Sequence, residues 1–280
     1  MTAAMSLDIG SLLPLAVALV AAGIVVGFMS GLLGIGGGGI LVPVLYETFA
    51  LIGVDPAIRM HMALATSLAV IVPTSVRSFS AHHTRGSVDV DILRRLGPWV
   101  VGGVFVGILV AESASTLVLK WIWIVFGTVM ALKMAFGRDT WRLGTQIPKG
   151  PGVEAYGILV GAVSVLISIG GAAFIVALMT LYGQPVLLAV GTSSGFGPLI
   201  SVPGVIGYIW AGWGDPRLPP LSLGYVSLIG AALIIPMSVF VAPFGVRMAH
   251  GIPKRSLEIA FAIFLAVVVS RFLWLALAEV

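Results

Sequence analysis

The residues of this chain whose types and spacing could do chemistry are glycines and hydroxyls, and the densest group is Ser30–Gly39, with the sequence SGLLGIGGGG. It lies in an apolar stretch, 12–52, that contains no Lys or Arg. Each glycine costs a helix about 1 kcal/mol relative to alanine, so the helix is expected to break there. Backbone N–H groups freed inside a bilayer need protein, water or a ligand as partners. A helix restarting at Gly37 or Gly38 would direct free N–H groups and its positive dipole end at the break, where an anion could bind.

A second and weaker break follows 134 residues later, at Ser168, Gly170 and Gly171. The matching pairs are Gly27 with Gly161, Ser30 with Ser164, Gly36 with Gly170, and Gly37 with Gly171. Ala172 and Ala173 replace two of the glycines of the first break. Close helix packing would also explain small residues, but a run of four glycines favours irregular backbone over packing alone.

Hydroxyl side chains form a further pair of sets, Thr66-Ser67 and Thr192-Ser193-Ser194, at a spacing of 126 residues. The same spacing relates Gly86 to Gly212 and Asp89 to Asp215. Hydroxyls inside a span usually bond carbonyls of their own helix, whereas their recurrence favours donors to substrate oxygens. The candidate substrate-binding residues are Ser30, Gly34, Gly36, Gly37, Gly38, Thr66, Ser67, Ser168, Gly170, Gly171, Thr192, Ser193 and Ser194.

Few charged residues fall within the apolar segments. Arg77 is a candidate anion attractor at the mouth of a path, although bases near a span end usually extend to the lipid headgroups. Lys133 and Arg271 are expected to extend to the lipid headgroups. Glu47 and Glu154 could carry a coupling proton, but each lies near a span end and is expected to be solvated.

The composition of the chain excludes most other classes of protein. The 280 residues are 59% hydrophobic and 9% charged, with a mean hydropathy of +1.14, whereas soluble domains carry about 25% charged residues. The chain is therefore a multi-pass membrane protein, and its net charge of +4 indicates orientation, not nucleic-acid binding. Without cysteine, and with only His82-His83 as a paired ligand, no metal or other cofactor is expected. The pattern Gly34-x-Gly36-x-x-Gly39 lacks the βαβ context of a dinucleotide site. The first basic residue is Arg59, so the N-terminus is expected to be retained.

Apolar segments predict an all-α integral membrane protein. They are 12–33, 38–52, 61–81, 96–112, 116–136, 154–169, 172–183, 186–210, 222–243 and 256–276. The longest polar stretch, 137–152, predicts a cytoplasmic linker between a first transmembrane repeat, 1–136, and a second, 153–280.

Basic residues indicate how the repeats are oriented. Loop 81–95 has three arginines and its counterpart 211–221 has one, whereas loop 112–120 has one base and its counterpart 243–256 has three. If each break is a hairpin, one side of the membrane holds nine bases and the other three; if each is a kink, the division is seven to five. Cytoplasmic loops are rich in Lys and Arg. This predicts two inverted repeats, each a glycine-broken helix pair plus three transmembrane helices, with both termini outside the cytoplasm.

Several motifs together resemble those of the TauE/SafE sulfite-exporter family over nearly the whole chain. They are Gly31–Gly38 followed by Pro43, Ala65-Thr66-Ser67, Gly86 with Asp89, Gly170-Gly171 and Gly191-Thr192-Ser193. The resemblance implies a bacterial inner-membrane carrier of sulfite, sulfoacetate or other small anions, mostly outward. The chain departs from the pattern at Ala172 and Ala173, and Pro203 stands opposite Arg77 in the repeat.

These observations predict a secondary transporter that binds a small anion at a midplane site and works by alternating access, with a proton or other ion as a candidate coupling partner. An anion channel would use the same site without alternating access. A membrane enzyme should show intramembrane His, Asp or Glu clusters, which the sequence lacks. A scaffold subunit would have no use for paired helix breaks.

The inverted arrangement can be tested because the chain has no native cysteine. Single cysteines at Val88 and Trp213 occupy matching loops of the two halves, so a membrane-impermeant thiol reagent should reach them from opposite sides. Labelling of both from one side would contradict inverted repeats.

Overall fold

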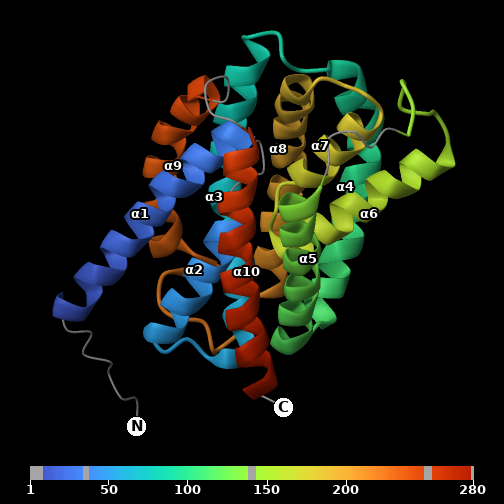
Figure 1. The fold of residues 1–280 in the computed structure, drawn as a ribbon. Coiled ribbons are helices and arrows are strands. Elements are labelled where there is room, and N and C mark those ends of the chain that lie inside the picture. The colour runs from blue at the N-terminus through green and yellow to red at the C-terminus, as the bar shows by residue number, and fades with distance from the viewer. Residues whose placement is uncertain (1–8, 34–37, 138–142, 249–253, 279–280) are drawn as a thin grey trace.

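The computed structural model describes residues 9–33, 38–137, 143–248 and 254–278. These residues form ten helices and one pair of short antiparallel strands (Figure 1). The helices are α1 (Ile9–Leu33), α2 (Gly38–Leu51), α3 (Pro56–His83), α4 (Val90–Ser113), α5 (Thr116–Phe136), α6 (Pro151–Ile167), α7 (Ala172–Leu181), α8 (Val186–Ala211), α9 (Leu228–Met248) and α10 (Lys254–Ala278). Five of them, α3, α4, α5, α8 and α9, are long and apolar enough to cross a membrane. The molecule is an all-α membrane protein.

The observed helices extend beyond the predicted apolar segments where polar first turns are capped. The Asp55 carboxylate accepts from Ala57 N at 2.8 Å at the start of α3, and Asp89 accepts from Ile92 N at 3.0 Å at the start of α4. The predicted segment 222–243 is wrong at its beginning. Strands β1 (Ser222–Leu223) and β2 (Val226–Ser227) turn through Gly224, and α9 starts only after them.

Two sides of the molecule are distinguished below by their connections. The linker side carries the α3–α4 loop and residues 143–150, and the strand side carries the α2–α3 turn and the β1–β2 pair (Figure 1). The α1–α2 pair begins and ends toward the strand side, whereas the α6–α7 pair begins and ends toward the linker side. At the end of α7, Leu143 N donates to Leu181 O at 2.7 Å, which ties α7 to the linker. Each pair therefore enters from one side and turns back inside the molecule.

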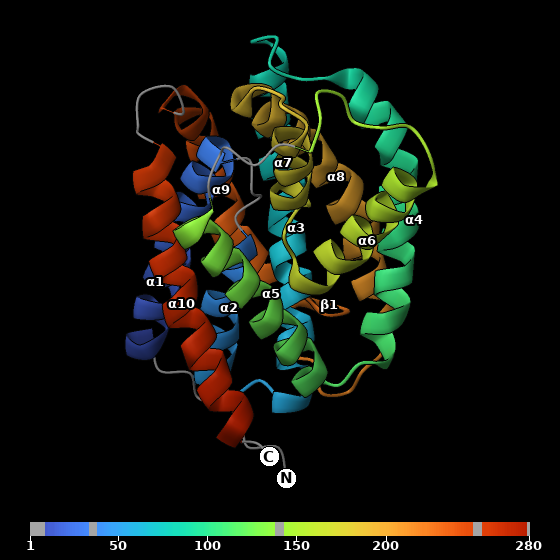
Figure 2. The same cartoon turned by 45° about the vertical axis from the view of Figure 1, so that its right-hand side comes forward.

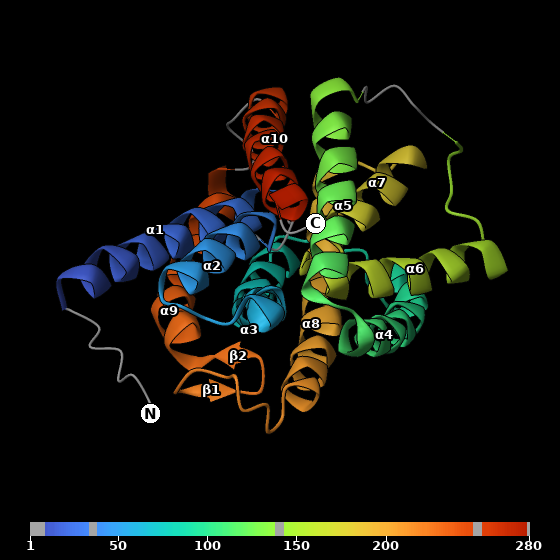
Figure 3. The ribbon, with the colours of Figure 1, turned by 90° about the horizontal axis from the view of Figure 1, so that it is seen from below.

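Helices α3 and α8 cross at the centre in opposite directions. Gly197 of α8 faces Ser75 of α3, and Gly204 faces Leu68. Seen from the strand side, α1, α2 and α9 lie on the side of the crossing where α3 is, and α4, α6 and α7 lie on the side where α8 is (Figure 3). Helices α5 and α10 pack side by side along one edge of this arrangement (Figure 2).

Helix α1 packs parallel to α9 through a stripe of glycines. Gly23, Gly27 and Gly31 face the backbone of Ile234, Ser238 and Ala242. A Cβ on Gly27 would lie 2.3 Å from the carbonyl oxygen of Ser238. Small residues at four-residue spacing let membrane helices approach backbone to backbone.

Helix α6 packs parallel to α4 in the same way. A Cβ on Gly161 of α6 would lie 1.9 Å from the carbonyl oxygen of Val100 in α4. On α4, a Cβ at Gly103 would lie 2.0 Å from the Ile158 carbonyl oxygen. The sequence therefore forms two close helix pairs, one on each side of the α3–α8 crossing.

Two adjacent glycines of α4 test this packing with a matched control. Gly103→Ala should lower the free energy of unfolding by about 1–3 kcal/mol, because the added methyl meets the α6 backbone. Gly102→Ala should be neutral or stabilising by up to about 1 kcal/mol, because nothing lies within 4 Å of a Cβ there. The measurement is thermal or denaturant unfolding in detergent. Equal effects of the two substitutions would contradict the described α4–α6 contact.

Candidate substrate site

The two helix breaks meet inside the molecule. Gly38 is the first residue of α2, and a Cβ on it would lie 1.5 Å from the carbonyl oxygen of Ser168, at the end of α6. The start of α2 thus lies directly on the backbone of the second break, an approach that leaves no room for a side chain. The other predicted glycines of the first break, Gly34, Gly36 and Gly37, lie outside the described residues. Ser30 is buried in the last turn of α1 before that break.

The second break turns through left-handed backbone. Ser168 has φ +53° and Gly171 has φ +70°, with Gly170 between α6 and α7. Few residues other than glycine adopt positive φ, and those that do cluster at functional sites. A Cβ on Gly171 would lie 2.4 Å from Cδ1 of Ile200 in α8, so this turn packs against the centre of α8.

Two hydroxyls at the second break lack hydrogen-bond partners. The Oγ atoms of Ser164 and Ser168 are fully buried and bond to no other described residue. A buried polar group left without a partner costs about 1–3 kcal/mol. The beginning of α7 directs its positive dipole end at the same turn. Hydroxyl donors beside a helix N-terminus form an arrangement that can bind a small oxyanion.

The structure does not bring the predicted threonines together. Thr66 lies two residues before Leu68, which faces Gly204, whereas Thr192 lies twelve residues before Gly204. At 1.5 Å per helical residue, the two threonines are about 20 Å apart along the crossing helices. One lies toward the strand side and the other toward the linker side.

The serines next to these threonines differ in their hydrogen bonding. Ser193 donates to Val190 O at 2.8 Å and Ser194 to Gly191 O at 2.6 Å, as hydroxyls inside helices usually do. Ser67 is buried on α3, and its Oγ has no hydrogen-bond partner within the described parts of the chain.

The charged candidates lie away from the breaks. Arg77 is exposed near the end of α3. Glu47, expected to be solvated, and Arg271, expected to extend to the headgroups, pair with each other at 3.0 Å and join α2 to α10, and their side chains stay 38% and 49% exposed. The Arg271 guanidinium also lies 5.0 Å from the ring centroid of Trp274.

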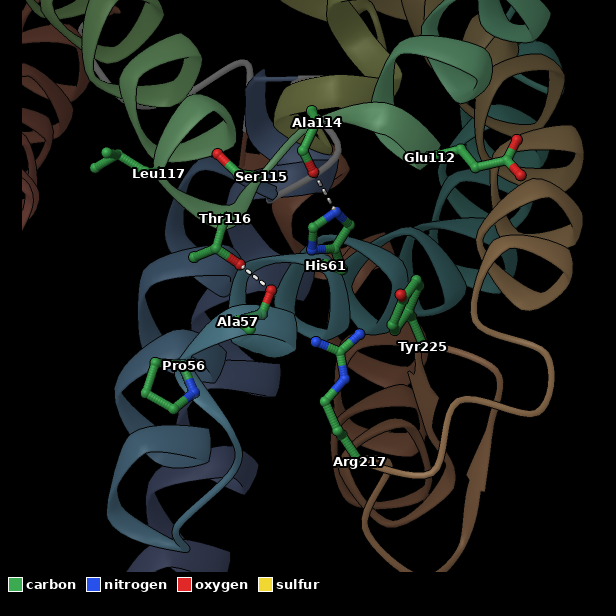
Figure 4. A pocket seen from close by; sticks show the side chains of 10 residues that line it. All are labelled: Pro56, Ala57, His61, Glu112, Ala114, Ser115, Thr116, Leu117, Arg217 and Tyr225. Atoms are coloured by element: carbon green, nitrogen blue, oxygen red, sulfur yellow. Dashed lines mark hydrogen bonds between the residues drawn. The ribbon is translucent and has the colours of Figure 1, made fainter.

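A pocket of about 470 Å³ opens on the strand side between the start of α3, the α4–α5 turn and the segment that precedes β2 (Figure 4). His61 lies at its centre, and Nε2 is 3.2 Å from Ala111 O and 3.1 Å from Ala114 O. Carbonyl oxygens only accept, so Nε2 carries a proton and is the donor to both. This pocket is not among the predicted sites, although His61, a histidine inside an apolar span, was a signal for it.

The pocket is not suited to hold an anion. Arg217 is its cationic side chain, but it binds Asp215 through three hydrogen bonds of 2.6–3.0 Å. These bonds lower the pKa of Asp215 to about 2, so the pair persists until the pH falls toward that value. The charge of Arg217 is therefore compensated by Asp215, and Glu112 adds a negative charge to the lining.

Comparison with known proteins identifies the kind of protein in which these features occur. The family model of the sulfite exporter TauE/SafE matches residues 19–272. The chain belongs to the TauE/SafE family. It is 34% identical over 251 residues to a probable membrane transporter protein of Haemophilus influenzae, covering 88% of this chain and 93% of that protein. It is 28% identical over 263 residues to a probable membrane transporter protein of Methanocaldococcus jannaschii, covering 91% and 93%. No solved structure matches the chain. The TauE/SafE protein is thus a multi-pass membrane transporter.

The hydrogen bonds of His61 give a stability prediction for this TauE/SafE protein. His61→Phe should lower the free energy of unfolding by about 1–3 kcal/mol, because two carbonyl oxygens lose their shared donor. His83→Phe is the control, because His83 is exposed and stacks on Phe79, so it should change stability by about 0.5 kcal/mol or less. Unfolding in detergent measures both. An unchanged His61→Phe protein would show that Nε2 is not the donor to these carbonyls.

Proposed function

We propose that this protein exports small oxyanions, sulfite or organosulfonates such as sulfoacetate, across the bacterial inner membrane. The observation that carries the proposal is the meeting of the two helix breaks, Gly38 on Ser168, beside the unpartnered hydroxyls of Ser164 and Ser168. The family match supports the class of substrate, since its model describes sulfite exporters.

The chemistry of the breaks suits such a substrate. Sulfite and sulfonates present several oxygens that accept hydrogen bonds, and hydroxyls and helix N-termini donate them. The proposed site comprises Ser30, Gly34, Gly36, Gly37, Gly38, Ser164, Ser168, Gly170 and Gly171. A site built from dipoles binds an anion less tightly than one built from cations, and a carrier must also release its substrate.

The remaining predicted hydroxyls have a different place in this proposal. Thr66-Ser67 lies toward the strand side of the breaks and Thr192 toward the linker side, so an anion would pass them on entering or leaving the centre. Arg77 remains a candidate attractor at the linker side, the proposed cytoplasmic side. A proton or other ion remains the candidate for coupling.

We further propose that residues 1–136 and 153–280 are inverted repeats that rock about the central site. The parallel packing of α1 on α9 is repeated by α6 on α4, with glycines at the contact in both. The α1–α2 and α6–α7 pairs enter from opposite sides. Both features are expected if a two-fold axis in the membrane plane relates the halves.

Transport can be measured with purified protein in liposomes loaded with radiolabelled sulfite or sulfoacetate. Ser168→Ala should reduce the efflux rate at low substrate by about tenfold or more, because the anion loses a hydroxyl donor. Ser113→Ala is the control, because the Ser113 hydroxyl is exposed and bonds its own helix. If neither anion leaves wild-type liposomes faster than protein-free ones, or if Ser168→Ala has full activity, the proposal fails.

A further inference from the structure

We infer that Thr66 and Thr192 are positioning residues that form two equivalent latches, one closing the path to the central site from each side of the membrane. The inference rests on the proposed two-repeat transport cycle and adds the residues that control access. It comes from two hydrogen bonds, each of which joins a central helix of one half to the beginning of a helix in the other half.

The first latch lies toward the strand side. The Thr66 hydroxyl, in α3 of the first half, accepts from the backbone N–H of Ser227 at 2.9 Å. Ser227 immediately precedes α9 in the second half, and its own hydroxyl accepts from Gly230 N at 3.2 Å. Thr66 is fully buried, and its Cγ2 would lie 3.3 Å from a Cβ on Gly230. The beginning of α9 is thus held against α3.

The second latch repeats the first toward the linker side, with the halves exchanged. The Thr192 hydroxyl, in α8 of the second half, accepts from the backbone N–H of Asp89 at 2.8 Å. Asp89 is the N-cap of α4 in the first half, and its carboxylate accepts from Ile92 N at 3.0 Å. Thr192 is also fully buried. In both latches the side chain of the cap residue accepts a hydrogen bond from the N–H of the third following residue. The backbone N–H of the cap residue donates to a threonine hydroxyl of the opposite half.

The equivalence of the latches extends along the loops before them. At a spacing of 138 residues, Gly86 matches Gly224, Asp89 matches Ser227 and Ile92 matches Gly230. Both loop glycines have positive φ, +68° and +52°. The hydrogen bonds therefore do not follow the predicted pairing of Gly86 with Gly212 and Asp89 with Asp215. The interval from Thr192 to Ser227 is twelve residues longer than that from Thr66 to Asp89, which is the difference between spacings of 138 and 126.

In a capping box, the N-cap N–H finds its partner within its own helix, in the side chain of a Glu or Gln at the third following residue. Ile92 and Gly230 hold these positions and have no side-chain acceptor. The N–H groups of Asp89 and Ser227 therefore depend on a threonine of the opposite half. When the halves move apart on one side, that N–H needs water, which a path open to that side supplies.

The strand-side latch lies at the inner end of the pocket, and the linker-side latch lies beneath the α3–α4 loop. On the strand side, the pocket is bounded inward by the rings of His61 and Tyr225, 5.1 Å apart, and Tyr225 lies two residues before Ser227. On the linker side, Ser87 bonds His82 at 3.1 Å and lies against Gly191, next to Thr192. With both bonds formed, the structure corresponds to a state closed to both sides, and transport requires one latch to open at a time.

The test uses a probe that needs no substrate. Ser201→Cys places a single thiol on the buried face of α8 in a chain without native cysteine. In this background, Thr66→Val should raise the rate of labelling by an impermeant thiol reagent about fivefold from the strand side only. Thr192→Val should do so from the linker side only. Right-side-out and inside-out vesicles give access to each side.

Matched controls separate this role from the general effect of losing a hydroxyl. Thr48 and Thr180 bond carbonyls of their own helices, at Val44 and Val176, so Thr48→Val and Thr180→Val should leave labelling unchanged. Thr66→Ser and Thr192→Ser keep the accepting oxygen and should restore the closed rate. Thermal unfolding identifies a variant that fails to fold. If one valine variant fails to fold, labelling of the serine variant at that position and of the valine variant of the other latch tests the proposal.

The outcomes distinguish the latches from the proposed substrate. If each valine variant raises labelling from both sides equally, or neither changes it, the latch proposal is overturned even where sulfite efflux is measured. If labelling is side-specific but no sulfite or sulfonate crosses liposomes, the latches stand and the proposed substrate is wrong.

Discussion

The structure depends on one close approach, that of Gly38 to the carbonyl of Ser168. Two helices that end inside a bilayer expose N–H and C=O groups that lipid cannot satisfy. Bringing the two ends together buries each against the other, and only a residue without a side chain allows this contact. Gly38 thus serves close packing, and in the proposed function the same absence of a side chain would let an anion reach the backbone.

Other parts of the molecule follow from the need to hold these ends at the centre while allowing movement. The α1–α9 and α4–α6 pairs meet through glycines, which give smooth surfaces without interlocking side chains. Pro73 and Pro198 interrupt the hydrogen bonding of α3 and α8 close to the level of the breaks. Hydrogen bonds between the halves lie about 10 Å to either side of this level, where they can form and break without disturbing the centre.

The sequence predicted the helices well and identified two helix breaks that the structure brings together, for physical reasons, whereas the roles of the candidate site residues stay predictions. Hydropathy located all ten helical segments because the bilayer imposes a strong constraint on composition. The prediction placed 222–227 in a helix, whereas these residues form a pair of short strands joined by a turn at Gly224. Recurrence identified Thr66 and Thr192 as equivalent, but equivalence does not give distance. Under the proposed two-fold relation, equivalent residues meet only if they lie near the axis; the breaks meet, whereas the threonines do not. The pairing of Asp89 with Asp215 failed because the second half carries a longer loop.

The most direct test of the central claim is to locate an oxyanion in the protein. Selenite is a close analogue of sulfite, and selenium scatters anomalously, so crystals soaked in selenite would show its position in an anomalous difference map. The account predicts a peak between the start of α2 and the Ser164–Gly171 turn, within hydrogen-bond distance of a serine hydroxyl. A peak confined to the Arg217 pocket or to surface arginines, with none at the breaks, would contradict it.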